Sequence, residues 1–178
     1  MIVDGFMRSG NTYLVSLLRT AFPDTSIGWS DPAHDLTVVQ EGGVIQPVRE
    51  PVGCLTSYLI LRQDHSLQAI HEAVELYVEF TNESHKNFVA RFEEFTTTPS
   101  VFLTQAEALL GERRVAIIPS ALQRNLIEAA TGADALVDPH TGRVPRSRVQ
   151  NYQSVRNTVV ESPHLAFAQA AYRQVCSG

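Results

Sequence analysis

A short polar turn near the N-terminus combines residue types that bind anions. Residues 2–6 are largely apolar and predict a buried strand, while residues 12–22 carry leucines at helical spacing and predict a helix. The turn that joins them supplies a cation, hydroxyl groups and a glycine: Arg8, Ser9, Gly10, Asn11 and Thr12. In a strand–turn–helix unit, backbone N–H groups and the positive end of the helix dipole point at the turn. The pattern predicts an anion site; the alternative is a plain strand-to-helix turn.

A second arginine stands where another predicted strand ends. Residues 44–48 predict that strand, Arg49 follows it, and residues 51–62 predict a helix. Ligands of open α/β sheets bind at the carboxyl ends of the strands, which favours Arg49 as a ligand-binding residue. Ser57 lies about two helical turns further on, so the two side chains could hold one phosphate from two sides. The alternative is an arginine paired with Glu50 and an exposed serine.

A third basic group lies near the C-terminus. Residues 138–147 are rich in proline, glycine and arginine and predict a loop. Residues 142–148, which begin inside this loop, contain three closely spaced arginines: Arg143, Arg146 and Arg148. Like charges at this spacing repel one another unless water or an anion lies between them. The loop therefore either contacts an anion or is simply a solvated basic loop.

The elements that would position these groups alternate between strands and helices. Strands are expected at residues 2–6, 44–48 and 87–92, with a short strand at 26–29 and an ambiguous segment, strand or helix, at 115–118. Helices are expected at residues 12–22, 51–62, 66–83, 99–110 and 120–130, and in two C-terminal segments split at Ser162 and Pro163. This order is typical of an α/β fold with a mostly parallel central sheet flanked by helices in three layers. The length of 178 residues predicts a single domain over residues 1–178.

The composition limits the classes of protein and partner. Hydrophobic residues make up 44% and charged residues 19%, which is ordinary for a globular chain. The net charge of −5 argues against a broad nucleic-acid surface. The chain carries no apolar run of about 18 residues and no signal-peptide pattern, so neither a membrane span nor a leader is expected. Cys54 and Cys176 lack metal-ligand spacing, which predicts reduced thiols, no metal site and a cytoplasmic protein.

Taken together and in this order, the motifs resemble the sulfotransferase family, which uses 3′-phosphoadenosine 5′-phosphosulfate as its sulfuryl donor. Residues 6–14 read FMRSGNTYL and are similar to the family's 5′-phosphosulfate loop, PKSGTTWL or PRSGTTWL. Arg49 and Ser57 match the arginine and the serine of its 3′-phosphate motif in type and spacing. The resemblance implies a P-loop-like sulfotransferase fold.

Two further stretches extend the resemblance over almost the whole chain. Residues 88–95 read FVARFEEF and, with Pro99 and the Leu110–Gly111 pair, resemble the family's RYEDL…P…FLG stretch. Residues 143–152 resemble the C-terminal basic loop that closes over the cofactor. The chain is shorter than most members of the family, so we expect acceptor-site insertions to be missing and the pocket to be more open.

The resemblance also implies roles for individual residues. The residues that would cradle the 5′-phosphosulfate are Arg8, Ser9, Gly10, Asn11 and Thr12. Those that would hold the 3′-phosphate are Arg49 and Ser57, helped by Arg143, Arg146 or Arg148. Tyr13 would lie against adenine, and Phe92 stands where the family commonly has tyrosine, which keeps stacking and loses a hydroxyl. No metal is implied.

The catalytic base is left open between a histidine and two carboxylates. Sulfuryl transfer needs the acceptor hydroxyl to lose its proton as it attacks sulfur in line, while Arg8 and Thr12 stabilise the leaving phosphate. A neutral histidine is a good base near pH 7, and His34 lies in the loop where many family members place theirs. Asp31 and Asp35 flank it, and either carboxylate could serve instead.

The resemblance therefore predicts an enzyme that sulfates a hydroxyl or amine of a small-molecule or carbohydrate acceptor and releases adenosine 3′,5′-bisphosphate. It leaves a homodimer open and implies neither a nucleic-acid nor a membrane partner. A P-loop phosphotransferase that uses ATP is an alternative, although the loop lacks the Walker A lysine. A protein that binds the nucleotide without turnover is another.

Overall fold

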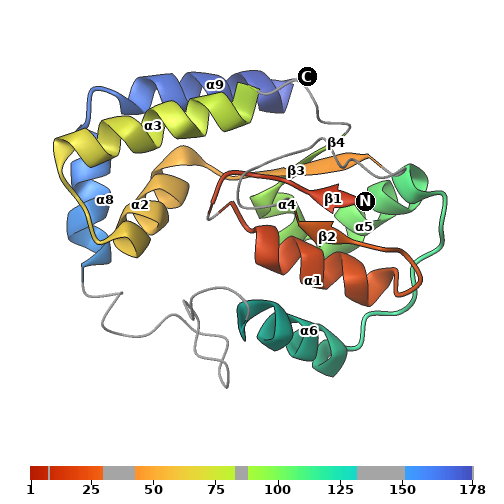
Figure 1. Cartoon of the computed structure of the whole chain (residues 1–178). Helices are drawn as coiled ribbons and strands as arrows, with labels where there is room; N and C mark the ends of the chain where they lie inside the picture. Colours follow the sequence, from red (N-terminus) through yellow and green to blue (C-terminus); the bar gives the residue numbers. More distant parts are fainter. Residues whose placement is uncertain (8, 30–42, 83–87, 132–150, 178) are drawn as a thin grey trace.

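The computed structural model describes residues 1–7, 9–29, 43–82, 88–131 and 151–177 (Figure 1). The strands are β1 (Ile2–Val3), β2 (Gly28–Trp29), β3 (Val44–Val48) and β4 (Phe88–Arg91). The helices are α1 (Asn11–Ala21), α2 (Pro51–Arg62), α3 (Leu67–Asn82), α4 (Phe92–Thr97), α5 (Pro99–Leu110), α6 (Pro119–Thr131), α8 (Tyr152–Glu161) and α9 (Leu165–Ser177). None of the helices within these ranges is both long enough and apolar enough to cross a membrane.

The strands form one small parallel sheet in the order β2-β1-β3-β4. Ile2 is in register with Gly28 on one side and Val44 on the other, and Ile45 is in register with Phe88. The expected α/β fold with a parallel sheet is thus confirmed.

β1 ends earlier than the sequence indicates, because Pro47 interrupts its pairing with β3. The backbone N–H of Asp4 still donates to the carbonyl of Ile45 at 2.9 Å. The next bond of a parallel ladder would come from the N–H of residue 47, and proline has none. The predicted strand over residues 2–6 is therefore wrong beyond Val3, where β1 ends.

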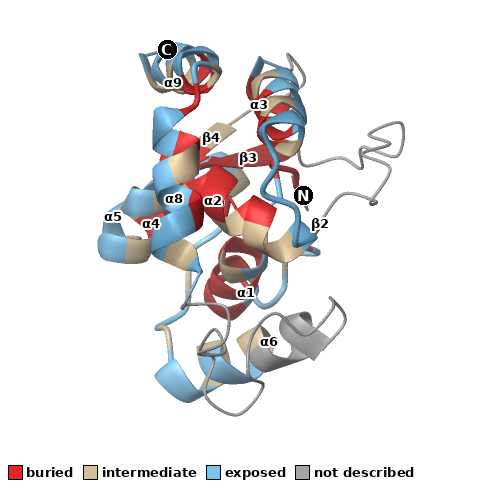
Figure 2. Cartoon of the chain, turned by 90° about the vertical axis from the view of Figure 1, so that its left-hand side faces the viewer, coloured by how far each residue is buried: buried red, intermediate tan, exposed pale blue. Residues whose placement is uncertain are grey.

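Helices cover both faces of the sheet. Ile45 of β3 belongs to an apolar cluster with α1, α4 and α5, which includes Leu14, Phe95 and Phe102. Gln46, the next residue, faces the other way and donates from Nε2 to the Phe80 carbonyl of α3 at 2.8 Å. All of β3 is buried, as Figure 2 shows, while α3 and α9 expose their outer faces.

A second apolar cluster lies among α2, α3, α8 and α9. Its largest fully buried members are Tyr77, Leu55, Leu59 and Ile70. The long helices α3 and α9 lie side by side along one side of the molecule (Figures 1 and 2). Phe6 belongs to this cluster, although it follows β1 by three residues.

The remaining helices lie close to their predicted ranges. Two other predicted segments differ from the structure. Residues 115–118 form neither a strand nor a helix; the backbone N–H of Val115 donates to the Ala21 carbonyl at 2.8 Å, and the Ile118 carbonyl accepts from the first turn of α6. The third strand stops at Arg91 rather than Phe92, which begins the short helix α4. The predicted loop at 138–147 lies outside the described residues.

Candidate functional site

Three strand-to-helix connections leave the same edge of the sheet. Because β1, β3 and β4 are parallel, the residues that follow them meet at their carboxyl ends. Gly10 precedes α1, Arg49 lies between β3 and α2, and Phe92 begins α4. We call Gly10, Asn11, Thr12, Arg49 and Phe92 the candidate site.

The turn between β1 and α1 is held by its own polar side chains. The buried Ser9 hydroxyl donates to the Phe6 carbonyl at 2.6 Å, and the Ser9 backbone N–H donates to the same oxygen at 3.0 Å. The Asn11 side-chain amide donates to the Gly5 carbonyl at 2.8 Å, and its Oδ1 lies 3.1 Å from the Ser9 hydroxyl. Ser9 and Asn11, both expected to contact an anion, thus use these side-chain groups to shape the turn itself.

Gly10 leaves the first turn of α1 without a side-chain cap. Its φ of +102° lies in the left-handed region, which glycine adopts without steric cost. The first N–H groups of a helix have no partner within the helix, so those of Asn11 and Thr12 point out at the end that carries the positive dipole. The N-terminus of α1 therefore offers donors and partial positive charge to a negatively charged group.

The Arg49 guanidinium lies over the face of the Phe92 ring. Its Cζ is 4.4 Å from the ring centre, close enough for a cation–π contact. The edge of the same ring packs on Gly10, where a Cβ atom would lie 2.7 Å from Phe92 Cδ2. Phe92 therefore links the arginine after β3 to the glycine before α1.

The Arg49 side chain also lies along the first turn of α2. A Cβ atom on Gly53 would be 3.4 Å from Arg49 Nη2. Gly53 and Ser57 are four residues apart and share a face of α2, so half-buried Ser57 lies one turn beyond the guanidinium. The carboxylate of Glu50 accepts from the N–H groups of Val52 and Gly53, both at 3.0 Å, and so caps α2.

Tyr13 lies next to the candidate site, within an aromatic cluster. Its ring stacks on Phe95 with centroids 6.1 Å apart, and Phe95 meets Phe92 edge-on at 5.5 Å. Burial raises the pKa of the Tyr13 phenol. Thr12 is exposed at the start of α1. Of the predicted residues, Phe92 thus contacts both Gly10 and Arg49, and Tyr13 reaches Phe92 through Phe95.

Two buried side chains contact the backbone of the segments that form the site. The sequence analysis did not single them out for this role. The Tyr77 hydroxyl of α3 donates to the Arg49 carbonyl at 2.7 Å. The Cys54 thiol of α2 lies 3.7 Å from the Met7 carbonyl, in hydrogen-bonding geometry. Helical periodicity predicts that both residues lie on helices, but these contacts span 28 and 47 residues and carry no local signal.

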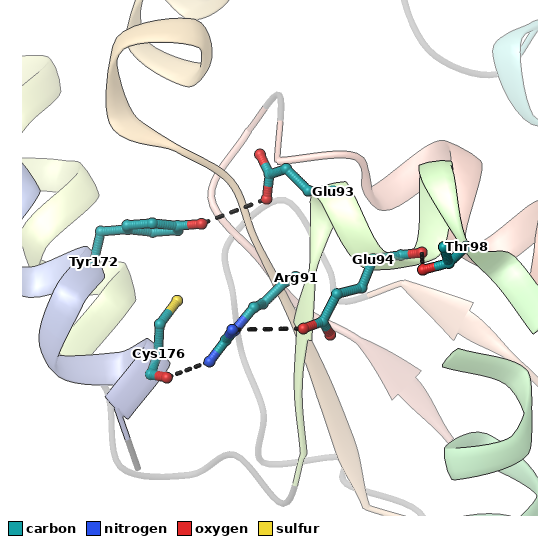
Figure 3. Close-up of polar contacts among 6 residues, drawn as sticks. All are labelled: Arg91, Glu93, Glu94, Thr98, Tyr172 and Cys176. Carbon is teal, nitrogen blue, oxygen red and sulfur yellow. Dashed lines mark hydrogen bonds and ion pairs between the residues drawn. The ribbon is translucent and has the colours of Figure 1, made fainter. Parts of the chain in front are cut away.

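The residues on either side of Phe92 attach it to the C-terminal helix (Figure 3). Arg91 donates from Nη2 to the Cys176 carbonyl at the end of α9 and pairs with Glu94 at 3.5 Å. The Tyr172 hydroxyl of α9 donates to Glu93 Oε2 at 3.4 Å. Burial is the main cause that raises the pKa of the Tyr172 phenol, and the nearby Glu93 raises it further. Burial also raises the pKa of the Cys176 thiol. We call these contacts the α9 clasp.

Several residues expected at the site lie outside the described residues. They are Arg8 of the turn, the three candidate bases His34, Asp31 and Asp35, and the loop arginines Arg143, Arg146 and Arg148. Among the residues that are described, no group of three or more His, Cys, Asp or Glu side chains is arranged to hold a metal ion.

An open hollow of about 570 Å³ lies away from the candidate site. Its lining includes Arg19 and Thr20 from the last turns of α1, Ile27 just before β2, and Asn125 of α6. The Arg19 Nε–H donates to the Ile27 carbonyl at 2.7 Å, and the Asn125 amide donates to the Thr20 hydroxyl at 2.9 Å. These polar groups join α1, α6 and β2 at the amino edge of the sheet, opposite Gly10 and Arg49.

Comparison with known proteins does not identify a family for this chain. No protein-family model matches the sequence, and no curated protein matches it.

Proposed function

We propose that the chain is a sulfotransferase that binds 3′-phosphoadenosine 5′-phosphosulfate at the carboxyl edge of its sheet. The observation that carries the proposal is the contact of Phe92 with both Gly10 and Arg49. It brings a fixed cation next to the uncapped N-terminus of α1, and each can take one anionic group. A nucleotide with phosphates at its 5′ and 3′ positions has two such groups.

The sequence resemblance selects this nucleotide over other anionic ligands. The family-like loop at residues 6–14 runs into the first turn of α1. The Arg49 side chain lies along the first turn of α2, one turn before Ser57 on the same face. In the proposal, the N-terminus of α1 takes the 5′-phosphosulfate, with Arg8 as its cation. Arg49 and Ser57 take the 3′-phosphate, and Arg143, Arg146 or Arg148 completes the charge balance.

The proposed reaction is a direct in-line transfer. A hydroxyl or amine of a small-molecule or carbohydrate acceptor attacks sulfur, and the bond between sulfur and the bridging phosphate oxygen breaks. Adenosine 3′,5′-bisphosphate leaves with that electron pair, and the acceptor's proton passes to a base. The candidate bases are His34, Asp31 and Asp35. The leaving phosphate is stabilised by Arg8 and by the Thr12 end of α1.

Calorimetric titration with adenosine 3′,5′-bisphosphate, and with ATP plus magnesium, tests the proposal. We expect the bisphosphate to bind in the micromolar range and Arg49→Ala to weaken it by about 2–3 kcal/mol, the scale of charged hydrogen bonds. Arg156→Ala, which removes an exposed arginine from α8, is the matched control and should leave binding unchanged.

The outcomes separate the competing functions. Binding of ATP in preference to the bisphosphate would overturn the proposal and favour a phosphotransferase. Bisphosphate binding without sulfuryl transfer to any acceptor would favour a protein that keeps the nucleotide site without turnover. Unchanged affinity in Arg49→Ala would remove Arg49 from the site. If transfer is found, His34→Ala should abolish it and leave nucleotide binding intact, whereas full turnover would move the base to Asp31 or Asp35.

A further inference from the structure

Tyr77 connects helix α3 to two of the segments that form the candidate site. Its side chain is 1% exposed, and its ring meets Phe6, in the turn after β1, edge-on at 5.4 Å. Its hydroxyl donates to the Arg49 carbonyl at 2.7 Å. A buried tyrosine hydroxyl needs a hydrogen-bond partner, and here the partner belongs to the arginine that carries the site's charge.

The bond to Tyr77 holds the Arg49 backbone just beyond the end of β3. Arg49 follows the last residue of β3 and precedes Glu50, the N-cap of α2, so its carbonyl lies between a sheet and a helix. Tyr77 holds this backbone, while the Phe92 ring holds the guanidinium at the other end of the side chain. An arginine side chain loses much rotamer freedom when it binds, so anchoring it at both ends favours binding by a pre-organised group.

We propose that Tyr77 is a positioning residue that makes the candidate site discriminate in favour of nucleotides with a 3′-phosphate. Tyr77 touches no ligand in this proposal and acts through the Arg49 backbone. The inference rests on the proposed function, because it needs a nucleotide whose 3′-phosphate contacts Arg49. Its expected signature is a change in selectivity beyond any change in stability.

The test compares two ligands that differ only in the 3′-phosphate. Calorimetry gives the Kd of adenosine 5′-monophosphate divided by that of adenosine 3′,5′-bisphosphate for each variant. We expect Tyr77→Phe to lower this ratio about fivefold, the effect of one lost hydrogen bond on the position of a charged partner. Phenylalanine keeps the ring contact with Phe6, so the variant retains the core packing.

Tyr58→Phe is the matched control. Tyr58 is also buried and also packs on Phe6, at 5.0 Å, but its hydroxyl accepts from Arg62 at 3.0 Å at the far end of α2. Its removal should leave the ratio unchanged. In an Arg49→Ala background, Tyr77→Phe should have no further effect on the ratio, because the guanidinium that Tyr77 positions is gone.

The outcomes distinguish this inference from the proposed function. A wild-type protein that does not prefer the bisphosphate overturns the proposed function. Two results would overturn the role of Tyr77 and leave the proposed function standing. In one, the wild type prefers the bisphosphate but Tyr77→Phe changes the Kd ratio by less than about twofold. In the other, Tyr77→Phe lowers the ratio equally with and without Arg49. An equal loss of selectivity in Tyr58→Phe would also overturn it, since the effect would then come from the Phe6 packing.

Discussion

Gly10 is the residue of the candidate site whose identity is most tightly constrained. Its φ of +102° excludes most side chains, and a Cβ atom would lie 2.7 Å from Phe92 Cδ2 and 3.0 Å from Phe95 Cζ. Phe95 is fully buried and cannot move without disturbing the core. Both the backbone and the packing at this position therefore require glycine.

We predict that Gly10→Ala destabilises the protein by about 2–4 kcal/mol, the sum of a left-handed backbone penalty and overpacking of the core. Urea unfolding measures this loss. Gly111→Ala is the control, since Gly111 also has a positive φ of 68° but would meet no atom within 4 Å. It should cost about 1 kcal/mol.

The same pair of variants shows how the prediction could fail. Equal losses in Gly10→Ala and Gly111→Ala would mean that the Phe92 contact imposes no constraint. A further check is Gly10→Ala in a Phe92→Ala background, where removal of the ring should return part of the lost stability.

At this scale, the sequence predicted the glycine and the arginine but not the internal use of the polar side chains. Gly10 and Arg49 stand out because strand–turn–helix patterns and strand ends have local signatures. The direction of the Ser9 hydroxyl has no local signature in the sequence, because it depends on the Phe6 carbonyl and on how the turn closes. The contact of Gly10 with Phe92 joins residues far apart in the chain, and only the packed fold brings them together.

At the scale of elements, the α9 clasp fixes the start of α4. Arg91 joins the end of α9 to the last residue of β4, and Tyr172 joins α9 to Glu93 in the first turn of α4. Phe92 lies between these two attachment points. The C-terminal helix therefore stabilises the backbone on both sides of the ring that contacts Arg49.

We predict that Arg91→Ala loosens α9 and costs about 1 kcal/mol, a small value because the Arg91 side chain is 43% exposed. Hydrogen exchange should accelerate over residues 165–177 and around residue 92, while α1 keeps its protection. Arg173→Ala, on the exposed side of α9, is the control. Unchanged exchange in α9 would show that its apolar packing alone holds it.

Elements with strong periodicity were predictable, and elements defined by tertiary contacts were not. α3 matches its prediction because its apolar positions recur at helical spacing over sixteen residues. β1 is shorter than expected because Pro47, in another strand, lacks the N–H that would extend their pairing. Residues 115–118 have the composition of a strand, but in the described chain they pair with no ladder: Val115 bonds to Ala21, and the Ile118 carbonyl accepts from the start of α6.

At the scale of the whole molecule, the turn after β1 passes between two separate apolar clusters. Phe6 packs among α2, α3 and α9, while Leu14, one turn into α1, packs against α5 and the sheet. The turn is therefore held from both sides, by the Phe6 ring and by the first turn of α1. This arrangement keeps the uncapped end of α1 in place without bound ligand, which favours pre-organised binding.

Three tyrosine phenols and one cysteine thiol, all buried or half-buried, predict how the stability of the molecule depends on pH. Burial is the largest cause of a raised pKa at Tyr13, Tyr77, Tyr172 and Cys176. In the unfolded chain these groups have their ordinary values of 10.0 for tyrosine and 9.0 for cysteine. Above those values the unfolded state loses protons that the folded state keeps, so rising pH favours unfolding.

We therefore predict that the free energy of unfolding is unaffected by these groups below about pH 9 and falls as pH rises beyond it. Urea unfolding at about pH 7.5 and about pH 10.5 measures the loss. Tyr77→Phe removes the most deeply buried of the four groups, so the variant should lose less stability than the wild type over this interval. Phe102→Leu is the control, because it loosens the core without removing a titratable group and should keep the wild-type slope. A Tyr77→Phe slope equal to that of the wild type would mean that the phenol becomes accessible to water before the protein unfolds, and that α3 opens locally around Arg49.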